Sequence, residues 1–376
     1  MSGWIVALLL GGAVAQEAAA PPAAAQAPIA ARPAAAAGRI EAAVDRRVEL
    51  FTLLARFAGF EEFNMAVARS PYSVAADSWF RDHKRHPALA RLQALRRDHG
   101  VSYDAIASLA VHVEDSIDLE ERVDFATAPE RLDKRWPVEQ VRPLLDEVRD
   151  FVQVADSEGF FDTQEERFTQ GAARLRAVIE GCKALPWFDA TFGARSGARY
   201  CAIPGFVCGG GNYGMGIRYA DGRDEEILPI FGCSSFDAAG VPTFGAEMAG
   251  LVIHELCHSY TNAFVDQLGE QLRPASTRLF DHDPEAMRRQ AYGSWQTVAY
   301  ETLVRATVVA CLRATDGEAA GAKQAKEERD RGFLWVPALA ADLDRFSADR
   351  KRWPTFADFL PELVTAFERE AAALPR

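Results

Sequence analysis

Apolar residues recur at three- and four-residue spacing along much of the first half of the chain, which is the pattern of helices with one buried face. Residues 164–181 show this spacing and end on Gly181, a residue type that often closes a helix. We therefore predict a helical N-terminal region over residues 39–185. The helices predicted within it span residues 39–60, 88–98, 138–155 and 164–181.

The pattern changes in the second half of the chain. Much of the glycine and proline lies in residues 186–245, and three short runs there predict strands over residues 199–203, 212–219 and 226–231. Helical spacing returns over residues 246–268, 294–312, 335–346 and 356–373. A small sheet between two helical regions predicts an α+β fold that is mostly α.

The first residues show neither pattern. Residues 4–15 are uncharged and end in Ala-Val-Ala, and this run is shorter than the about 20 apolar residues that a membrane span needs. Although no Lys or Arg precedes the run, it fits a secretory signal peptide over residues 1–15. Residues 16–38, almost entirely Ala and Pro, predict a linker. We expect an exported protein, periplasmic or extracellular, with no stable membrane insertion after signal removal.

Composition narrows the class of protein. The chain has 376 residues, 49% of them hydrophobic, and a net charge of −12, which is the balance of an acidic globular protein. A nucleic-acid binder needs a basic surface to neutralise phosphates, so nucleic acid is excluded as the expected partner.

Six cysteines, an even number, are compatible with an oxidising compartment, but they are too sparse for a disulfide framework. Cys201, Cys208 and Cys233 lie close together in the glycine-rich segment. We predict one disulfide among these three, without assigning the pair.

The residues most informative about chemistry are His254, Glu255 and His258, which form an H-E-x-x-H motif in a segment with helical spacing. Two imidazoles four residues apart lie on one face of a helix and can bind one zinc ion. Glu255 then lies beside that face, where it can act as the general base that takes a proton from water. Residues 246–268 contain no Pro, as such a helix requires.

A third protein ligand must complete a catalytic zinc site. The pattern with Gly and a third His is absent, because Thr261 and Phe264 stand at those positions. Glu301 is our prediction, because it lies in a mostly apolar helical segment where a carboxylate is costly to bury without a partner. Arg305 lies one turn later on the same face. The alternatives are Asp266, Glu270 and the cluster at residues 281–285, with His282 as the runner-up.

An H-E-x-x-H motif with a Glu on a separate downstream helix resembles the gluzincin class of zinc metallopeptidases, and so implies a zincin-like region over residues 186–376. Several segments also resemble a bacterial family of unassigned function for which peptidase activity is expected. The resemblance implies zinc at His254, His258 and Glu301, with Glu255 as the base. The segments that carry it are residues 72–89, 100–110, 209–214, 253–262 and 290–306.

The predicted activity is zinc-dependent hydrolysis of a peptide or protein substrate. Tyr292 and Arg305 are the candidate donors to the oxyanion of the transition state, and Asn262 is a candidate partner of His258. An extended peptide could pair with the strand at 212–219. The alternative is a non-catalytic exported binding or scaffold protein that retains a zincin-like fold, although a structural site has no use for the base Glu255.

Overall fold

The computed structural model describes residues 40–65, 69–125, 132–195, 197–209, 211–219, 225–245, 248–290 and 292–375. The predicted signal peptide (1–15) and linker (16–38) lie outside these residues, and so does the start of the helix predicted from residue 246.

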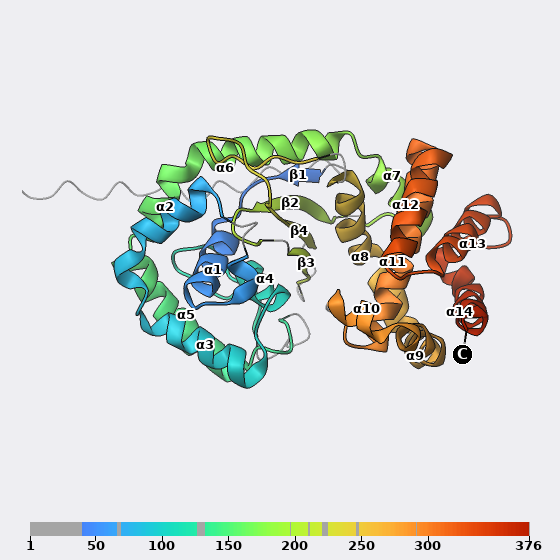
Figure 1. The fold of residues 1–376 in the computed structure, drawn as a ribbon, viewed down its shortest axis with the longest axis horizontal. Helices are drawn as coiled ribbons and strands as arrows, with labels where there is room; N and C mark the ends of the chain where they lie inside the picture. Colours follow the sequence, from blue (N-terminus) through green and yellow to red (C-terminus); the bar gives the residue numbers. More distant parts are fainter. Residues whose placement is uncertain are drawn as a thin grey trace, which may run out of the picture. The chain divides into compact units, whose positions relative to one another are not determined.

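A four-stranded mixed sheet lies between most helices of the first half and those of the second, whereas the helix at Ala184–Phe192 packs with the second group (Figure 1). Its order is β1-β2-β4-β3, with β3 antiparallel to β4 and the other neighbours parallel. The strands are β1 (Ile40–Ala42), β2 (Arg199–Gly205), β3 (Asn212–Ile217) and β4 (Glu226–Gly232). The three strands predicted in the glycine-rich segment are therefore confirmed.

The predicted helix over residues 39–60 is wrong at its start. Ile40–Ala42 forms β1, in parallel register with Tyr200–Ala202 of β2. Helix α1 (Arg46–Phe57) begins only after Asp45, whose carboxylate accepts a hydrogen bond from the Arg47 amide at 3.0 Å. A strand of three residues is too short to show an alternating pattern, so only its pairing with β2 reveals it.

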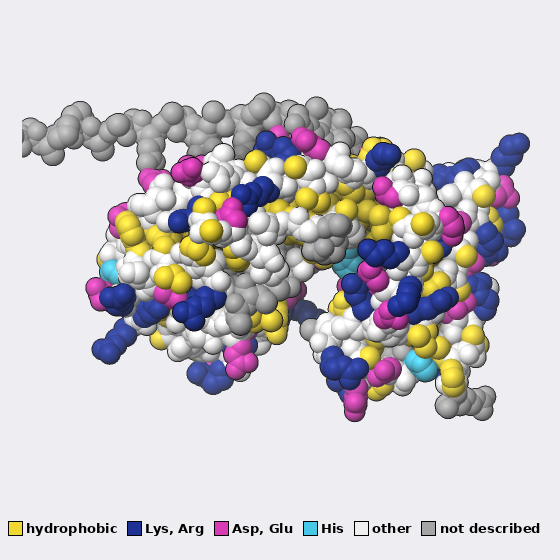
Figure 2. Space-filling view, turned by 45° about the horizontal axis from the view of Figure 1, so that its top comes forward, with side chains coloured by type: hydrophobic (Ala, Val, Ile, Leu, Met, Phe, Trp, Pro, Cys, Tyr) yellow, Lys and Arg dark blue, Asp and Glu magenta, His cyan; other side chains and the backbone are white. Residues whose placement is uncertain are grey.

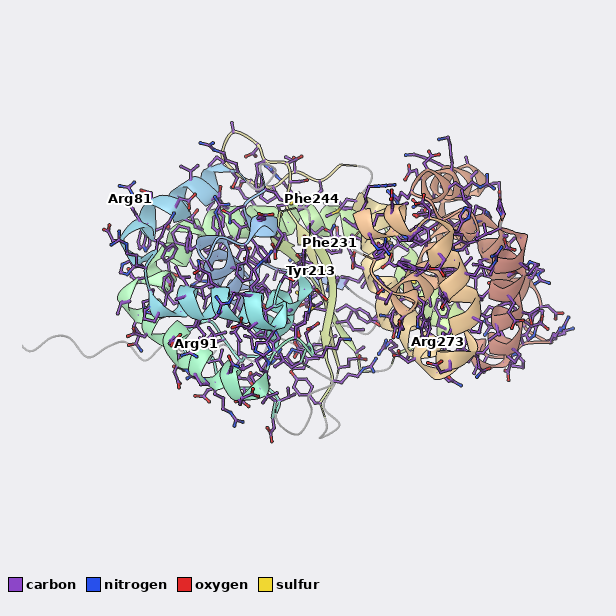
Figure 3. The ribbon with its side chains drawn as sticks, turned by 60° about the horizontal axis from the view of Figure 1, so that its bottom comes forward. Arg81, Arg91, Tyr213, Phe231, Phe244 and Arg273 are labelled. Carbon is purple, nitrogen blue, oxygen red and sulfur yellow. The ribbon has the colours of Figure 1, made fainter. Side chains whose placement is uncertain are left out.

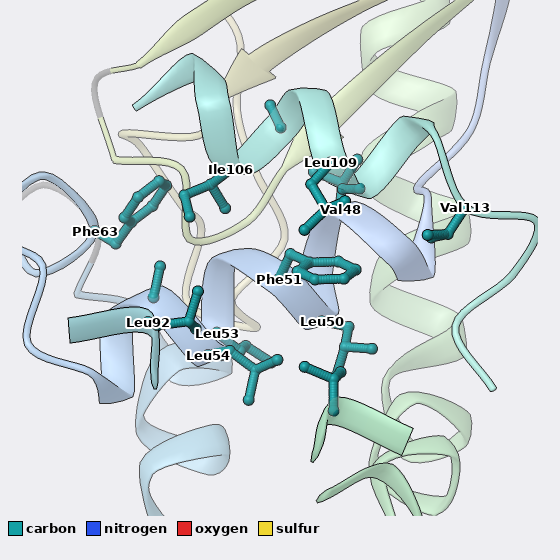
Figure 4. Packing of buried hydrophobic residues seen from close by; sticks show 14 of the residues in the cluster. Val48, Leu50, Phe51, Leu53, Leu54, Phe63, Leu92, Ile106, Leu109 and Val113 are labelled. Atoms are coloured by element: carbon teal, nitrogen blue, oxygen red, sulfur yellow. The ribbon is translucent and has the colours of Figure 1, made fainter. Parts of the chain in front are cut away.

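Seven α-helices precede β2 in the described residues. The first six bury a large apolar core against the sheet, part of which Figure 4 shows, and the seventh packs in the core around α8 (Met248–Leu268). Predicted helices are confirmed at α1, α3, α5 and α6, whereas α2, α4 and α7 were not predicted. The helices after α1 are α2 (Pro71–Trp79), α3 (Pro87–His99), α4 (Asp104–Val111), α5 (Val138–Val154), α6 (Ser157–Glu180) and α7 (Ala184–Phe192).

All four predicted helices of the second half are present as α8, α11, α13 and α14, and α9, α10 and α12 add to them. His282, the runner-up for the third ligand, is the last residue of α9. The helices are α8 (Met248–Leu268), α9 (Arg273–His282), α10 (Pro284–Arg289), α11 (Trp295–Asp316), α12 (Glu318–Asp330), α13 (Val336–Ala348) and α14 (Phe356–Ala373).

The two faces of the sheet pack against different cores. On β4, Ile227 and Phe231 pack with residues of α8, whereas Leu228 and Ile230 pack with the N-terminal helices. This alternation follows from the two-residue period of a strand. Figure 3 shows the sheet between the two groups of helices, with Tyr213 and Phe231 labelled. The expected α+β fold, mostly α, is therefore confirmed.

Helix α11 is buried on nearly every side. Val304 and Val308 belong to the core beneath α8, and Val298 and Leu303 to a separate core of the C-terminal helices. A helix that lies between two cores is apolar all round rather than on one stripe. Every polar side chain in its middle turns is consequently buried and needs a partner.

The predicted disulfide is wrong. Cys208 and Cys233 are buried free thiols, and every pair among Cys201, Cys208 and Cys233 includes one of these two. Separately, none of the described helices combines the length and apolarity that crossing a membrane requires.

Glu49 of α1 is fully buried, and its Oε1 accepts a hydrogen bond from the Phe206 amide at 2.8 Å. Burial raises the pKa of Glu49 from 4.5 to about 7. The folded state therefore holds this proton more tightly than the unfolded state, and stability falls as pH rises from about 4.5 to about 7.

We expect Glu49→Gln to raise the free energy of unfolding at about pH 8 by about 1–3 kcal/mol, and to change it little at about pH 4. Urea denaturation of both chains at the two pH values measures this difference. Glu61→Gln, at an exposed position, is the control and should stay within about 0.5 kcal/mol at both. An equal effect of Glu49→Gln at both pH values would contradict the assignment.

Candidate metal centre

Helix α8 places His254 and His258 on one face, one turn apart, with their ring centroids separated by 5.1 Å. The opposite side of this helix is anchored in the core, since Leu256 and Cys257 are fully buried. The two imidazoles are therefore presented by a rigid element rather than by a loop.

Helix α11 brings Glu301 to the same point. Its Oε2 lies 3.5 Å from His254 Nε2, and its Oε1 lies 3.5 Å from His258 Nε2. One ligand atom from each of the three residues lies within 4.8 Å of the others. Zinc–ligand bonds of about 2.0–2.2 Å are compatible with these separations. The three predicted ligands are thus brought together by two helices.

The other candidates for the third ligand contact residues outside the histidine pair or lie away from it. Asp266 accepts a hydrogen bond from the Tyr300 hydroxyl, and Glu270 pairs with Arg273 at 3.0 Å. His282, at the end of α9, is outside the cluster of potential ligands found in the described residues. Among the candidates considered from sequence, Glu301 alone lies beside both histidines.

Asn262, one turn after His258, lies where it was predicted to. Its Oδ1 is 3.2 Å from His258 Nδ1, so a proton on that nitrogen would complete a hydrogen bond. This contact orients the ring and leaves Nε2 directed at Glu301.

Tyr292 and Arg305 both contact Glu301. The Tyr292 hydroxyl donates to Glu301 Oε2 at 2.9 Å and accepts from Arg305 Nη2 at 2.8 Å. The same Arg305 nitrogen lies 3.0 Å from Glu301 Oε2. In this arrangement both donors hold the carboxylate in place, and their predicted role toward an oxyanion stays a prediction.

Sequence reasoning missed Glu328, which is 1% exposed and holds the other side of the Arg305 guanidinium. Its Oε2 accepts from Arg305 Nη1 at 2.5 Å, while Gln324 and Arg331 donate to its Oε1 at 2.6 and 3.0 Å. In the sequence Glu328 belongs to a charged run typical of a solvated helix face. Only the packing of α12 on α11 shows that it is buried.

Burial and the charge of Glu301 together determine the pKa values in the cluster. Burial raises the pKa of Glu255 to about 7 and lowers that of His254 to about 3. Burial alone would also raise the pKa of Glu301, but the imidazoles and Arg305 outweigh it and hold this pKa well below its usual range. At His258 the Glu301 carboxylate outweighs burial and raises the pKa to about 9. Glu301 is therefore anionic, as a ligand to a cation must be.

These residues line a cavity of about 1090 Å³ between β3, α8 and α12. Figure 2 shows a histidine side chain where the surface is hollowed. Gly214 of β3 faces α8 so closely that a Cβ atom there would lie 3.3 Å from His258 Cβ and 3.2 Å from the Glu255 carbonyl oxygen. The strand therefore passes directly over the H-E-x-x-H motif.

The chain belongs to the family described as a domain of unknown function (DUF4932), which matches residues 40–366. The matched range contains both helices that carry the cluster. No curated protein and no solved structure gives a significant match to the chain. The family supplies no activity, so the function is argued from the site.

We expect Glu328→Ala to lower the free energy of unfolding by about 3–5 kcal/mol, because the buried Arg305 loses its shortest ion pair. Chemical denaturation measures the change. Glu327→Ala is the matched control, since this neighbour on α12 is 40% exposed and makes only long contacts, of 3.9 and 4.0 Å. If Glu328→Ala lowered the stability no more than Glu327→Ala, the buried pair of Arg305 and Glu328 would not support the site.

Proposed function

We propose that this protein is a zinc-dependent hydrolase with a zincin-like core, and that its substrates are peptides or proteins. The observation that carries the proposal is the convergence of His254, His258 and Glu301, with Glu255 between the two histidines in sequence. Export to the periplasm or the exterior stays a prediction, since residues 1–15 lie outside the described part of the chain.

The donor set favours zinc over the common alternatives. Two imidazoles and one carboxylate are typical of catalytic zinc, whereas calcium and magnesium prefer oxygen ligands only. Three protein ligands leave a coordination position open. A zinc ion held there would act as a Lewis acid toward a carbonyl oxygen and would lower the pKa of a water molecule.

Glu255 is suited to move a proton. It is 7% exposed, and its pKa of about 7 lets the carboxylate both accept and release a proton near neutral pH. In the proposed reaction Glu255 takes a proton from the attacking water and passes it to the leaving amine. Tyr292 and Arg305 are proposed to donate to the oxyanion, which requires Tyr292 to leave Glu301.

The edge of the sheet supports a peptide as the substrate. In the described residues β3 pairs with β4 on one side only, and its segment at residues 211–215 lines the cavity. The unpaired N–H and C=O groups of an edge strand can bind an extended peptide by strand addition. Gly214 keeps this edge close to Glu255 and His258. A peptide bound there would pass the proposed base.

We expect the purified full chain to contain one zinc ion, and His258→Ala and Glu301→Ala to lose it. Each variant removes one of only three protein ligands, and elemental mass spectrometry measures the content. His282→Ala is the control and should keep the metal. Zinc retained in Glu301→Ala would assign the third ligand elsewhere, and a zinc-free wild type after growth in zinc-replete medium would favour the binding or scaffold function.

We expect Glu255→Ala to keep its zinc and to lower peptide hydrolysis by about 10²–10⁴-fold, because the base is lost while the ligands remain. An internally quenched peptide library measures the activity. Glu270→Gln, on the surface in a pair with Arg273, should cleave like wild type. Failure of the zinc-loaded wild type to cleave any peptide in the library would exclude the peptidase assignment.

A further inference from the structure

The residue before α4 is an exposed tyrosine in an unfavourable backbone conformation. Tyr103 has φ +48° and ψ −121°, a region that residues with a side chain rarely adopt, and it is 46% exposed. It is one of seven large apolar side chains exposed in the described residues, and of these seven it alone lines the cavity that holds His254 and His258.

The backbone on one side of Tyr103 is fixed by a buried carboxylate. The Tyr103 amide donates to Glu62 Oε1 at 3.2 Å. The Glu62 side chain is only 4% exposed, and the same oxygen accepts from Arg96 at 2.6 Å. The guanidinium of Arg96 in turn lies over the Phe60 ring, 4.4 Å from its centroid. The loop is therefore tied to the N-terminal core.

Arg135 fixes the flanking residues. It donates to the Ser102 carbonyl oxygen at 3.2 Å and to Asp104 Oδ1 at 2.5 Å. It also pairs with Asp133 at 2.8 Å. Strain that is held by so many contacts is a feature found at ligand-binding sites.

Stability gives no reason for tyrosine at this position. The hydrogen bond from its backbone amide to Glu62 needs no side chain at residue 103. Glycine would adopt the same conformation without the steric cost. The ring itself is half exposed, so it contributes little to the core. What the side chain does provide is an aromatic surface on the wall of the cavity.

The Tyr103 side chain lines the cavity through which the path proposed for a peptide substrate runs. Helix α4 packs against β3, and Tyr103 lines the same cavity as Tyr213 and Gly214 of that strand. Gly214 faces Glu255 and His258. A peptide paired with β3 would therefore lie in the same cavity as Tyr103, where one of its side chains could contact the ring.

We propose that Tyr103 forms a subsite that selects an aromatic or large aliphatic side chain of the substrate; this inference rests on the proposed peptidase function. The ring offers a face for stacking and apolar contact. The nearby guanidinium of Arg135 pairs with Asp104 and Asp133, so these three charged groups compensate one another and favour an apolar side chain over an acidic or basic one.

The test compares the full-length wild type with Tyr103→Gly and Tyr103→Phe on an internally quenched peptide library. We expect wild type to cleave peptides with an aromatic or large aliphatic residue at one position about 10–100-fold faster, in kcat/KM, than the same peptides with Ala there. Tyr103→Gly should reduce this ratio to below about threefold, and Tyr103→Phe should keep it, since the ring remains.

Two measurements separate a subsite from a structural role. Thermal unfolding should show Tyr103→Gly at least as stable as wild type, because the substitution relieves strain, and its zinc content should be unchanged. Ile117→Ala, at another exposed apolar residue that does not line the cavity, should keep the wild-type ratio.

An unchanged preference in Tyr103→Gly would overturn the subsite while leaving the peptidase function intact. A wild-type preference for a charged side chain at the affected position would also overturn it. No cleavage by zinc-loaded wild type would overturn the peptidase function, and the subsite with it.

Discussion

The burial of one carboxylate organises the centre of this protein. Glu301 lies in the middle of α11, a helix enclosed between two apolar cores, where an unpaired negative charge would be prohibitively costly. Two imidazoles from α8, the hydroxyl of Tyr292 and the guanidinium of Arg305 surround it. The packing of α8 on α11 therefore buries the Glu301 carboxylate, which is unfavourable by itself, and also brings to it the groups that compensate its charge.

That compensation extends outward through Arg305. The guanidinium is buried too, and its charge is balanced on the far side by Glu328 of α12, which in turn receives Gln324 and Arg331. From Glu301 to the exposed Arg331, each charged group of this network pairs with the next one. An added cation would bind Glu301 without leaving Arg305 unpaired, because Glu328 remains. The arrangement is thus compatible with a site that gains and loses a metal ion without unfolding.

The opposite wall of the cavity is formed by β3 and by the residue before α4, Tyr103. Strand β3 comes close to α8 only because Gly214 has no side chain, and it leaves one edge unpaired in the described residues. Beyond it, Tyr103 is held in a strained conformation by Glu62 and Arg135. One wall thus presents the charged groups, and the other presents a close backbone and an apolar surface; in the proposed function the first would move protons. This division is what a hydrolase for extended chains would require.

The residues of the metal centre could be predicted from the sequence, because the signals for them lie in the spacing and composition of single helices. The four-residue interval of His254 and His258 predicted their shared face, and the apolar surroundings of Glu301 singled it out as a carboxylate that needs a partner. The strand β1, the burial of Glu328 and the wall formed by Tyr103 were decided by tertiary structure. Each depends on contact with residues far away in the chain, and such contacts leave no periodic signal in the segment itself.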